Sequence, residues 1–496
     1  MPNPLATPLY RQLFWLASFG FAIAALALAE SVFSLNTVAG FAIGFAALLP
    51  SYFWVRGLAH GLPIFPIVSL YYLNTYALPL VIGHPGVLKY SESDRLIAAG
   101  TTIGYLLLAT AVWYSITAAR WSPPSRYTGF AENRTGGIFI VFLAVGCFFV
   151  SPLPWKFLPD LSPEVQSALK MGILGLAILS AAVLGFQWGG RRLSSTGKIL
   201  FSGFLALYIA IDASGLILHG AFSLILTIAA TYTLARGRFP VLLLAIAIPI
   251  LALLHLGKWQ MREAYWTDRP KPFPGYVEYY LDWGGYGLKE LGIGQDEMAT
   301  TRKTQRASAI ERASVIQMLL LVQTKSPDQV PYMAGESYTM IPELLVPRLI
   351  HPNKPWSHEG TYRLAVHYGI QNRQQTRKTT IGFGPLAESY ANFGFPGVAV
   401  LAILMGFISG RIAVWGEGLP ITSFRGLFGL LTLTALMQTE STLGVMLSSW
   451  FQGTMALVGV RLLFMRSLSG PVRETPPRPI ATSALRPRRP IPSPMS

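Results

Sequence analysis

The stretch GFPGVAVLAILMGFISGRI, residues Gly394–Ile412, decides the fold of this chain. Its one charged residue, Arg411, stands next to its end. About 20 residues of this kind form an α-helix that crosses the roughly 30 Å of hydrocarbon in a bilayer. A helix satisfies all its backbone polar groups internally, which lipid requires. The stretch therefore predicts a membrane-spanning helix.

Other apolar runs of similar length occur along the whole chain. Only 12% of the 496 residues are charged and 52% are hydrophobic, whereas soluble domains carry about a quarter charged residues. Two runs nearly touch at Asp212–Gly215, so the total is eleven to twelve. We predict an all-α polytopic membrane protein with about 12 transmembrane helices. The further runs are Leu13–Ala29, Thr37–Val55, Leu62–Ile82, Ile97–Ala118, Gly137–Leu158, Leu169–Phe186, Ile199–Ser214, Leu216–Ala235, Val241–Leu256, Ile421–Met437 and Leu443–Met465.

The net charge of +16 is carried mainly by short loops between the apolar runs. Lys and Arg collect in alternate loops and in the tail, which by the positive-inside rule predicts that both termini are cytoplasmic. This pattern indicates a multi-pass protein of a bacterial inner membrane, in contact with membrane lipid. The basic residues do not form a stripe of the kind that binds nucleic acid, so we expect no nucleic-acid partner.

The segment Gly257–Pro385 differs from the rest, with 16 Lys or Arg and 12 Asp or Glu among its 129 residues. A loop of this length must fold or act as a linker, and it contains an amphipathic helical pattern at Thr304–Gln323. We therefore divide the chain into spans one to nine (1–256), an extracytoplasmic loop domain (257–385), spans ten to twelve (386–466) and a disordered basic tail (467–496).

No pattern for a cofactor or metal site is present. The single cysteine, Cys147, lies inside an apolar run, so neither a disulfide framework nor a cysteine-based metal site is expected. The chain has no P-loop and no His/Cys spacing of the kind that binds zinc. Any reaction would therefore depend on side chains and on the substrate itself.

Three short stretches in and after the loop segment carry a resemblance. GESY (Gly335–Tyr338), VPRLIHPNKP (Val346–Pro355) and GPLAESYANFGFPG (Gly384–Gly397) resemble signatures of the Wzy-like oligosaccharide repeat-unit polymerases. Val346 stands where that family usually has isoleucine. The resemblance implies a glycosyltransferase of the GT-C-like kind, which joins polyprenyl diphosphate-linked repeat units of O-antigen or exopolysaccharide. Partners implied with it are a flippase and a chain-length regulator.

Physical chemistry agrees with this interpretation. An enzyme acting outside the membrane lacks nucleotide sugars, so its substrate must bring a leaving group, as a polyprenyl diphosphate-linked glycan does. Arginine and lysine stabilise the departing diphosphate. Prolines that bracket Arg348 and Lys354 restrict the backbone there. The basic residues expected to bind substrate are Arg348, Lys354, Arg363, Arg373 and Arg377, together with the motif tyrosines Tyr338 and Tyr390.

The acceptor hydroxyl needs a base or a hydrogen-bond acceptor. Glu388, close to the start of the tenth span, and Glu336 are the carboxylates best placed by sequence, and His351 competes with them, as do His358 and His367. Two other functions stay open. An O-antigen ligase would use the same donor with another acceptor. A lipid-linked glycan flippase is disfavoured because we find no paired repeats.

Overall fold

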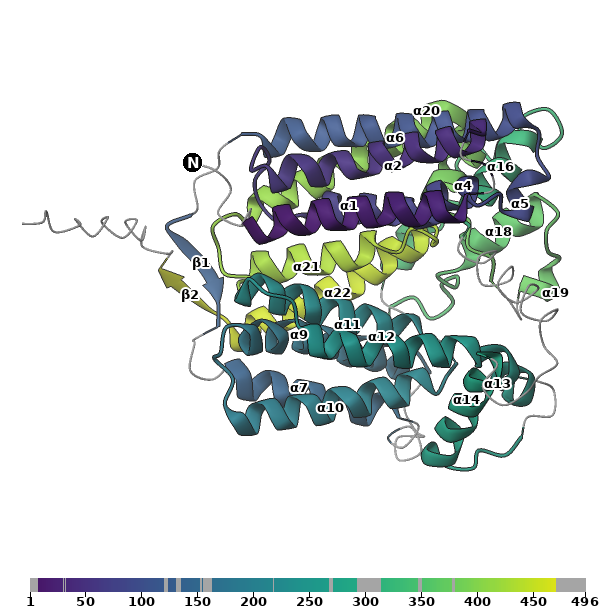
Figure 1. Cartoon of the computed structure of the whole chain (residues 1–496). Helices are drawn as coiled ribbons and strands as arrows, with labels where there is room; N and C mark the ends of the chain where they lie inside the picture. The colour runs from purple at the N-terminus through teal and green to yellow at the C-terminus, as the bar shows by residue number, and fades with distance from the viewer. Residues whose placement is uncertain are drawn as a thin grey trace, which may run out of the picture.

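The computed structural model describes residues 8–29, 31, 33–119, 124–130, 135–151, 154, 163–216, 218–266, 271–291, 314–346, 350–376 and 380–469. Its long helices run side by side in two bundles (Figure 1). The short helices between Lys258 and Thr376 gather at one end of the bundles, which we call the loop end. The two short strands lie at the opposite end, which we call the tail end.

The first bundle has its own hydrophobic core, to which the buried residues Ile43, Tyr76, Leu106, Leu319 and Leu386 belong. It contains α1 (Pro8–Leu28), α2 (Leu35–Val55), α3 (Ile64–Tyr72), the π-helix η1 (Leu73–Ala77), α4 (Leu78–Val81), α5 (Pro85–Leu88), α6 (Glu92–Thr117), α16 (Ile316–Lys325) and α20 (Gly384–Trp415).

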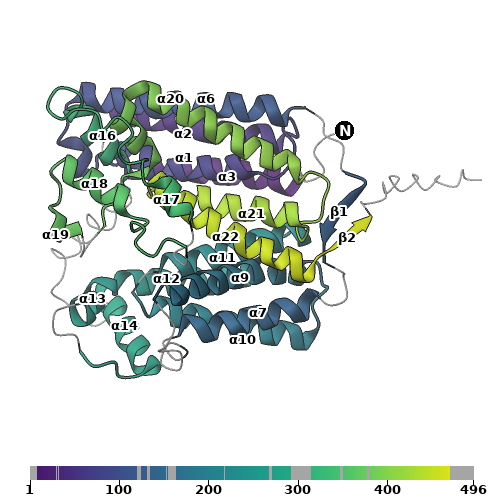
Figure 2. The ribbon, with the colours of Figure 1, turned by 180° about the vertical axis from the view of Figure 1, so that it is seen from behind.

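The second bundle has a separate core around Phe139, Leu184, Phe201, Ile228 and Leu457. Two helices, α21 and α22, lie between the bundles (Figure 2) and join them, since α22 packs on α9 and α21 packs on α3. The second bundle contains α7 (Thr135–Val150), α9 (Pro163–Gly189), α10 (Ser195–Ala213), α11 (His219–Arg236) and α12 (Val241–Leu256). The joining helices are α21 (Phe424–Leu436) and α22 (Leu443–Phe464).

Local sequence explains where these helices begin and how closely they pack. Serine side chains accept the backbone N–H of the third helical residue at four starts, namely Ser34, Ser91, Ser194 and Ser423. Helices α6 and α20 make the most extensive pairing in the fold. A Cβ at Gly406 would lie 2.4 Å from the carbonyl oxygen of Ala109, so the small residue permits this approach.

Short elements occupy the two ends. At the loop end lie α13 (Lys258–Tyr265), α14 (Tyr276–Glu290), α17 (Ile341–Leu345), α18 (Glu359–His367) and α19 (Arg373–Thr376). At the tail end, β1 (Arg126–Gly129) pairs with β2 (Arg466–Ser469) in antiparallel fashion, with Arg126 opposite Ser469 and Gly129 opposite Arg466. Gly129 also bridges to Ser423, which starts α21.

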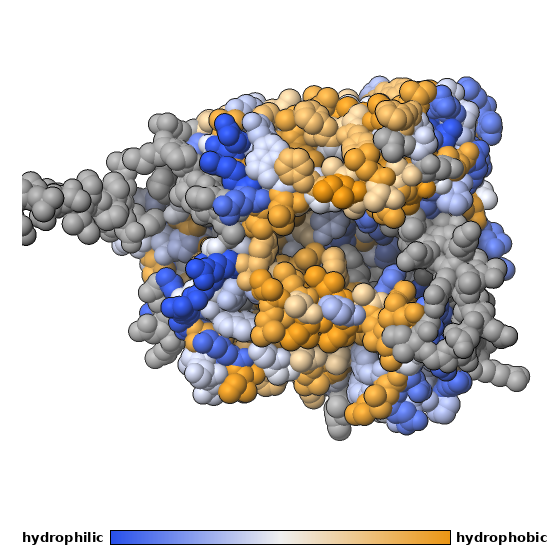
Figure 3. Space-filling model, in the orientation of Figure 1, coloured by the Kyte–Doolittle hydropathy of each residue, from blue (hydrophilic) through white to orange (hydrophobic). Residues whose placement is uncertain are grey.

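Seven helices among the described residues are long and apolar enough to cross a membrane, or eight if the bent pair α12 and α13 is one span. Four shorter apolar helices are Thr135–Val150, Gly175–Gly189, Gly220–Arg236 and Phe424–Leu436. The chain is thus a mainly helical protein with the features of a multi-pass membrane protein. Hydrophobic residues cover the middle of both bundles, hydrophilic residues lie toward their ends, and the face is hollowed between the bundles (Figure 3). The total of twelve spans remains a prediction.

Three expectations about boundaries need correction. The helix that contains the apolar run Gly394–Ile412 extends back to Gly384. It has a kink at Gly394, and the residues before the kink are helical too. Residues 467–469, expected in a disordered tail, belong to β2, since β1 offers an edge with free backbone groups. The pattern at Thr304–Gln323 is helical only from Ile316 onward in the described part, and residues 301–313 lie outside it.

Candidate functional site

The candidate site begins with a break in α20. Gly394 has φ 62° and ψ −147°, so the helix changes direction there. Positive φ is a conformation that glycine adopts without a steric penalty. A Cβ at this position would lie 2.8 Å from the hydroxyl oxygen of Tyr332. The residues before the break, Gly384–Phe393, therefore form a separate half-helix at the loop end.

The break frees backbone carbonyls, and the two residues directly before the GESY segment satisfy them. The N–H of Met333 donates to the carbonyl of Ala391 at 2.9 Å, and the N–H of Ala334 donates to that of Asn392 at 3.1 Å. The Asn392 side chain in turn accepts the N–H of Gly335 at 3.0 Å. Two of the stretches that carry the family resemblance are thereby held against each other, although they lie far apart in the sequence.

Glu388 lies at the centre of this contact and is fully buried, with 0% of its surface exposed. Its Oε1 accepts the hydroxyl of Ser337 at 2.9 Å, and its Oε2 accepts the backbone N–H of Leu443 at 2.6 Å. Asn392 donates through Nδ2 to the Ser337 hydroxyl oxygen and to the Glu388 carbonyl, each at 2.8 Å. The carboxylate thus has a hydrogen-bond donor on each oxygen.

Two helix N-termini meet this carboxylate. Leu443 is the first residue of α22, and the helix has no side-chain cap of its own at Thr442. Gly360 is the second residue of α18, and a Cβ there would lie 3.8 Å from Glu388 Oε1. The hydroxyls of Thr361 and Thr442, 3.0 Å apart, connect the two helix starts. Because helix N-termini carry partial positive charge, this position favours an anion.

The other two polar residues of GESY point in different directions. Tyr338 places its hydroxyl 3.1 Å from Ser389 Oγ, and burial, assisted by the charge of Glu388, raises the pKa of Tyr338 well above its usual range. Glu336 faces outward with 56% of its side chain exposed, 3.5 Å from Arg363. Tyr390 is buried, with its ring against Phe395. The structure therefore joins Glu388 to Ser337 and places Glu336 outside that network.

The basic residues predicted to bind diphosphate have unequal surroundings. Arg363 and Arg373 both contact the carboxylate of Glu359, at 3.5 Å and 2.9 Å, and Arg373 is 60% exposed. The ammonium group of Lys354 donates to the carbonyls of Leu344 and Val346, at 2.9 and 2.8 Å, where α17 ends. Lys354 therefore stabilises a helix end in this conformation. Arg348 and Arg377 lie outside the described residues.

The three histidines lie around α18. His351 is exposed in the segment that precedes it. His358 stands directly before the helix, and burial lowers the pKa of His358. His367 donates through Nε2 to the carbonyl of Pro331 at 2.8 Å. Within the described ranges, no three His, Cys, Asp or Glu side chains form a group that would hold a metal ion.

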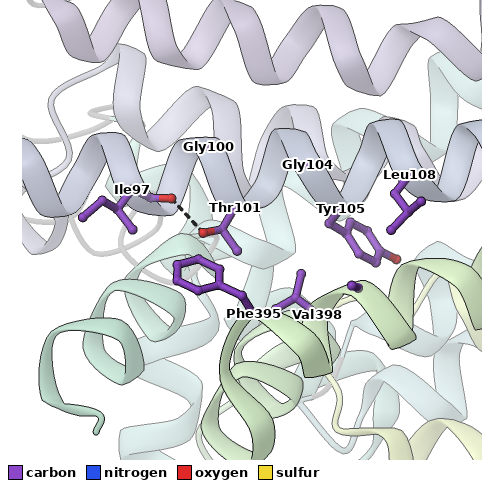
Figure 4. A pocket seen from close by; sticks show the side chains of 9 residues that line it. Ile97, Gly100, Thr101, Gly104, Tyr105, Leu108, Phe395 and Val398 are labelled. Atoms are coloured by element: carbon purple, nitrogen blue, oxygen red, sulfur yellow. Dashed lines mark hydrogen bonds between the residues drawn. The ribbon is translucent and has the colours of Figure 1, made fainter. Parts of the chain in front are cut away.

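A groove of about 400 Å³ runs between α6 and α20 (Figure 4). Gly100, Gly104 and Tyr105 line it from α6, and Phe395 and Val398 from α20. Its one aliphatic hydroxyl, Thr101, donates to the carbonyl of Ile97 and accepts from Gln323, both at 2.8 Å. The lining contains no carboxylate, histidine or basic group, so this groove differs in chemical character from the Glu388 network.

Ser337 and Asn392 lie within the quoted motifs but were not predicted as site residues. Gly360, Thr361 and Thr442 were not predicted either. A partial signal was available, because Glu388 and Asn392 are four residues apart and share a helix face. The threonines and Gly360 carry no local signal, since only the meeting of the α18 and α22 starts, linked by the Thr361–Thr442 hydrogen bond, brings them near the carboxylate.

Comparisons with known proteins add no assignment to this geometry. The chain matches no protein-family profile, and no curated protein and no solved structure is significantly similar to it.

Proposed function

We propose that the chain is a membrane glycosyltransferase that polymerises polyprenyl diphosphate-linked oligosaccharide repeat units. The observation that carries this proposal is the contact of the GESY segment with the half-helix Gly384–Phe393, centred on the buried Glu388. These are the stretches that resemble the polymerase signatures. Hydrogen bonds from Ser337 and from the start of α22 hold both oxygens of this carboxylate in a fixed orientation.

The surroundings suit a lipid-linked anionic donor. Exposed apolar side chains of α1 and α12, among them Leu16, Ile23, Leu242 and Ile250, face away from the protein core. Figure 3 shows a hollow between the two bundles with hydrophobic rims and hydrophilic residues deeper inside. The partly exposed guanidinium groups of Arg363 and Arg373 lie at the loop end, paired with a carboxylate that a diphosphate would replace.

The proposed reaction transfers the growing glycan to the next lipid-linked unit. A sugar hydroxyl of the acceptor attacks the anomeric carbon of the donor, and a new carbon–oxygen bond forms as the bond to diphosphate breaks. The diphosphate leaves on its polyprenyl chain, and Arg and Lys stabilise its charge. Glu388, Glu336 and His351 are the candidate proton acceptors. In the conformation described, Glu388 is buried and acts as a positioning residue for Ser337 and Leu443.

The test is reconstitution of the purified protein in liposomes with one defined lipid-linked repeat unit and no nucleotide or metal. Mass analysis of the glycans should show a ladder of added repeats. Single units that cross the bilayer without growing would instead identify a flippase. Transfer only to a supplied lipid A core acceptor would identify a ligase. Either result overturns the polymerase assignment.

A further inference from the structure

Helix α14, Tyr276–Glu290, carries a band of exposed apolar side chains. Val277 and Leu281 are 78% and 70% exposed, and Leu288 is exposed too. The aromatic residue Phe273, just before the helix, is also more than half exposed. Figures 1 and 2 show α14 at the loop end, lying across the ends of the long helices rather than along them.

The opposite side of α14 is firmly attached to the second bundle. The Tyr279 hydroxyl donates to the carbonyl of Ser214, which follows α10, at 2.8 Å. The Trp283 indole donates to the carbonyl of Leu254, in the last turn of α12, at 2.6 Å. These bonds satisfy carbonyls that a helix end leaves free. They also fix α14 at the level where α10 and α12 end.

Tyr280 shows which side of α14 points toward the bundle interior. Its hydroxyl donates to the carbonyl of Ala210, about one turn before the end of α10 at Ala213. This side of α14 therefore faces along the spans rather than away from them. With about 100° per residue, Val277, Leu288 and Leu281 lie at about 60–100° from Tyr280 around the helix.

Three of the four charged residues of α14 lie on the side opposite Tyr280, and the fourth, Glu290, accepts a hydrogen bond from Gln260 on the packed side. Glu278, Lys289 and Asp282 are at about 160–200° from Tyr280 and are all exposed. The helix thus has three faces: one packed on protein, one apolar and roughly at right angles to the Tyr280 side chain, and one charged and opposite Tyr280. Such a division of surface is typical of a helix that lies in the plane of a membrane interface.

We propose that α14 rests on the bilayer surface at the loop end and inserts Val277, Leu281 and Leu288 among the lipid headgroups and upper acyl chains. Helix α14 packs on α12, which also carries exposed apolar residues, among them Ile250 and Leu256. A stable protein interface uses about 20–30 residues per side, far more than this band supplies. The contact would hold the segment after residue 257 at the membrane, whatever reaction the chain catalyses.

The experiment places a nitroxide on single cysteines in the full-length protein, in a Cys147→Ala background. The protein is reconstituted in vesicles of phosphatidylcholine and phosphatidylglycerol. Labels at Val277, Leu281 and Leu288 should collide more with oxygen, which concentrates in lipid, than with a water-soluble nickel chelate. Matched labels at Glu278 and Asp282, on the same helix, should show the reverse ratio.

Two results would overturn the proposal. Equal exposure of both sets to the nickel chelate would place the apolar band in water. Protection of the apolar set from both reagents would show a protein cover. In that case, spectral broadening at full labelling, relieved by dilution with unlabelled chain, would identify a second copy. Since all these positions are exposed, a normal elution profile of each labelled variant serves as the control for folding.

Discussion

Replacing Glu388 by glutamine tests the network at the centre of the site. The side-chain carbonyl oxygen of glutamine can still accept the N–H of Leu443. Its amide group then faces Ser337 and can donate to the hydroxyl oxygen of that residue. The variant loses the negative charge between the starts of α18 and α22, worth about 0.3–1 kcal/mol per helix terminus. It also exchanges a charge-assisted hydrogen bond for a neutral one, a loss of about 1 kcal/mol. Burial of the charge itself costs free energy because Glu388 is fully buried, and relief of this cost in the variant opposes these losses.

We therefore expect the free energy of unfolding to fall by no more than about 1–2 kcal/mol in Glu388→Gln. Glu388→Ala should lose about 2–5 kcal/mol, because it leaves two buried donors without an acceptor. The chain provides its own reporter, since Cys147 is its single cysteine and is buried. A thiol-reactive dye then records thermal unfolding. Glu343→Gln, an exposed glutamate on α17, is the matched control.

Polymer formation by the same variants separates the two roles of this carboxylate. If Glu388 accepts the proton of the attacking hydroxyl, turnover in Glu388→Gln falls by about 10²–10⁴-fold, far more than its stability loss explains. If it only positions its neighbours, activity follows the folded fraction. Behaviour equal to Glu343→Gln in both melting and polymer length would refute the reasoning about this network.

Cysteine labels at Ser308 and Arg126 should react with impermeant reagents from opposite sides of the membrane; reaction from one side would contradict the predicted topology. Arg348→Ala should abolish polymer at normal protein level, and Arg348→Lys should restore little, since a point charge cannot reproduce the guanidinium fork; chain lengths unchanged from wild type would exclude the role. Burial lowers the pKa of His358 below its ordinary 6.5, so its stabilising effect is present above that value and is lost as pH falls toward the folded pKa; His358→Gln should flatten the acid decline in melting temperature. Gly394→Ala should cost about 1–3 kcal/mol in the same melting assay, because its φ of 62° with ψ of −147° suits glycine alone and an added Cβ would lie 2.8 Å from the Tyr332 hydroxyl oxygen; alanine at Gly100 or Gly104, on the open face of α6, should not destabilise.

The apolar helices were predictable from sequence because lipid imposes a local requirement. In the part of the chain that the structure describes, the expected apolar runs fall on helices, as Thr37–Val55 does on α2 and Val241–Leu256 on α12. The continuation of α20 back to Gly384 was not anticipated, since Glu388 and Asn392 interrupt the apolar pattern there. Buried polar residues that bond to one another look like loop residues when only hydropathy is considered.

The site was predictable only in its parts. Motif resemblance selected Glu388 and the GESY segment, and the structure places them in contact. The resemblance gave no information about Leu443, because this residue contributes a backbone N–H, which does not depend on its side chain. Lys354 was assigned to a diphosphate, but its ammonium group reaches two carbonyls at the end of α17. A basic side chain and a free helix end attract each other wherever packing brings them together.

The pairing of β1 with β2 has a consequence for the order in which the protein is assembled. Arg126 lies early in the chain and its partner Ser469 follows the last helix. During synthesis, the backbone groups of β1 therefore lack their β2 partners until residues 466–469 have left the ribosome. Contacts between distant parts of a chain form late because closing a long loop costs entropy. Closure of this strand pair marks completion of the second bundle, and a ribosome stalled before residue 466 would leave that edge exposed.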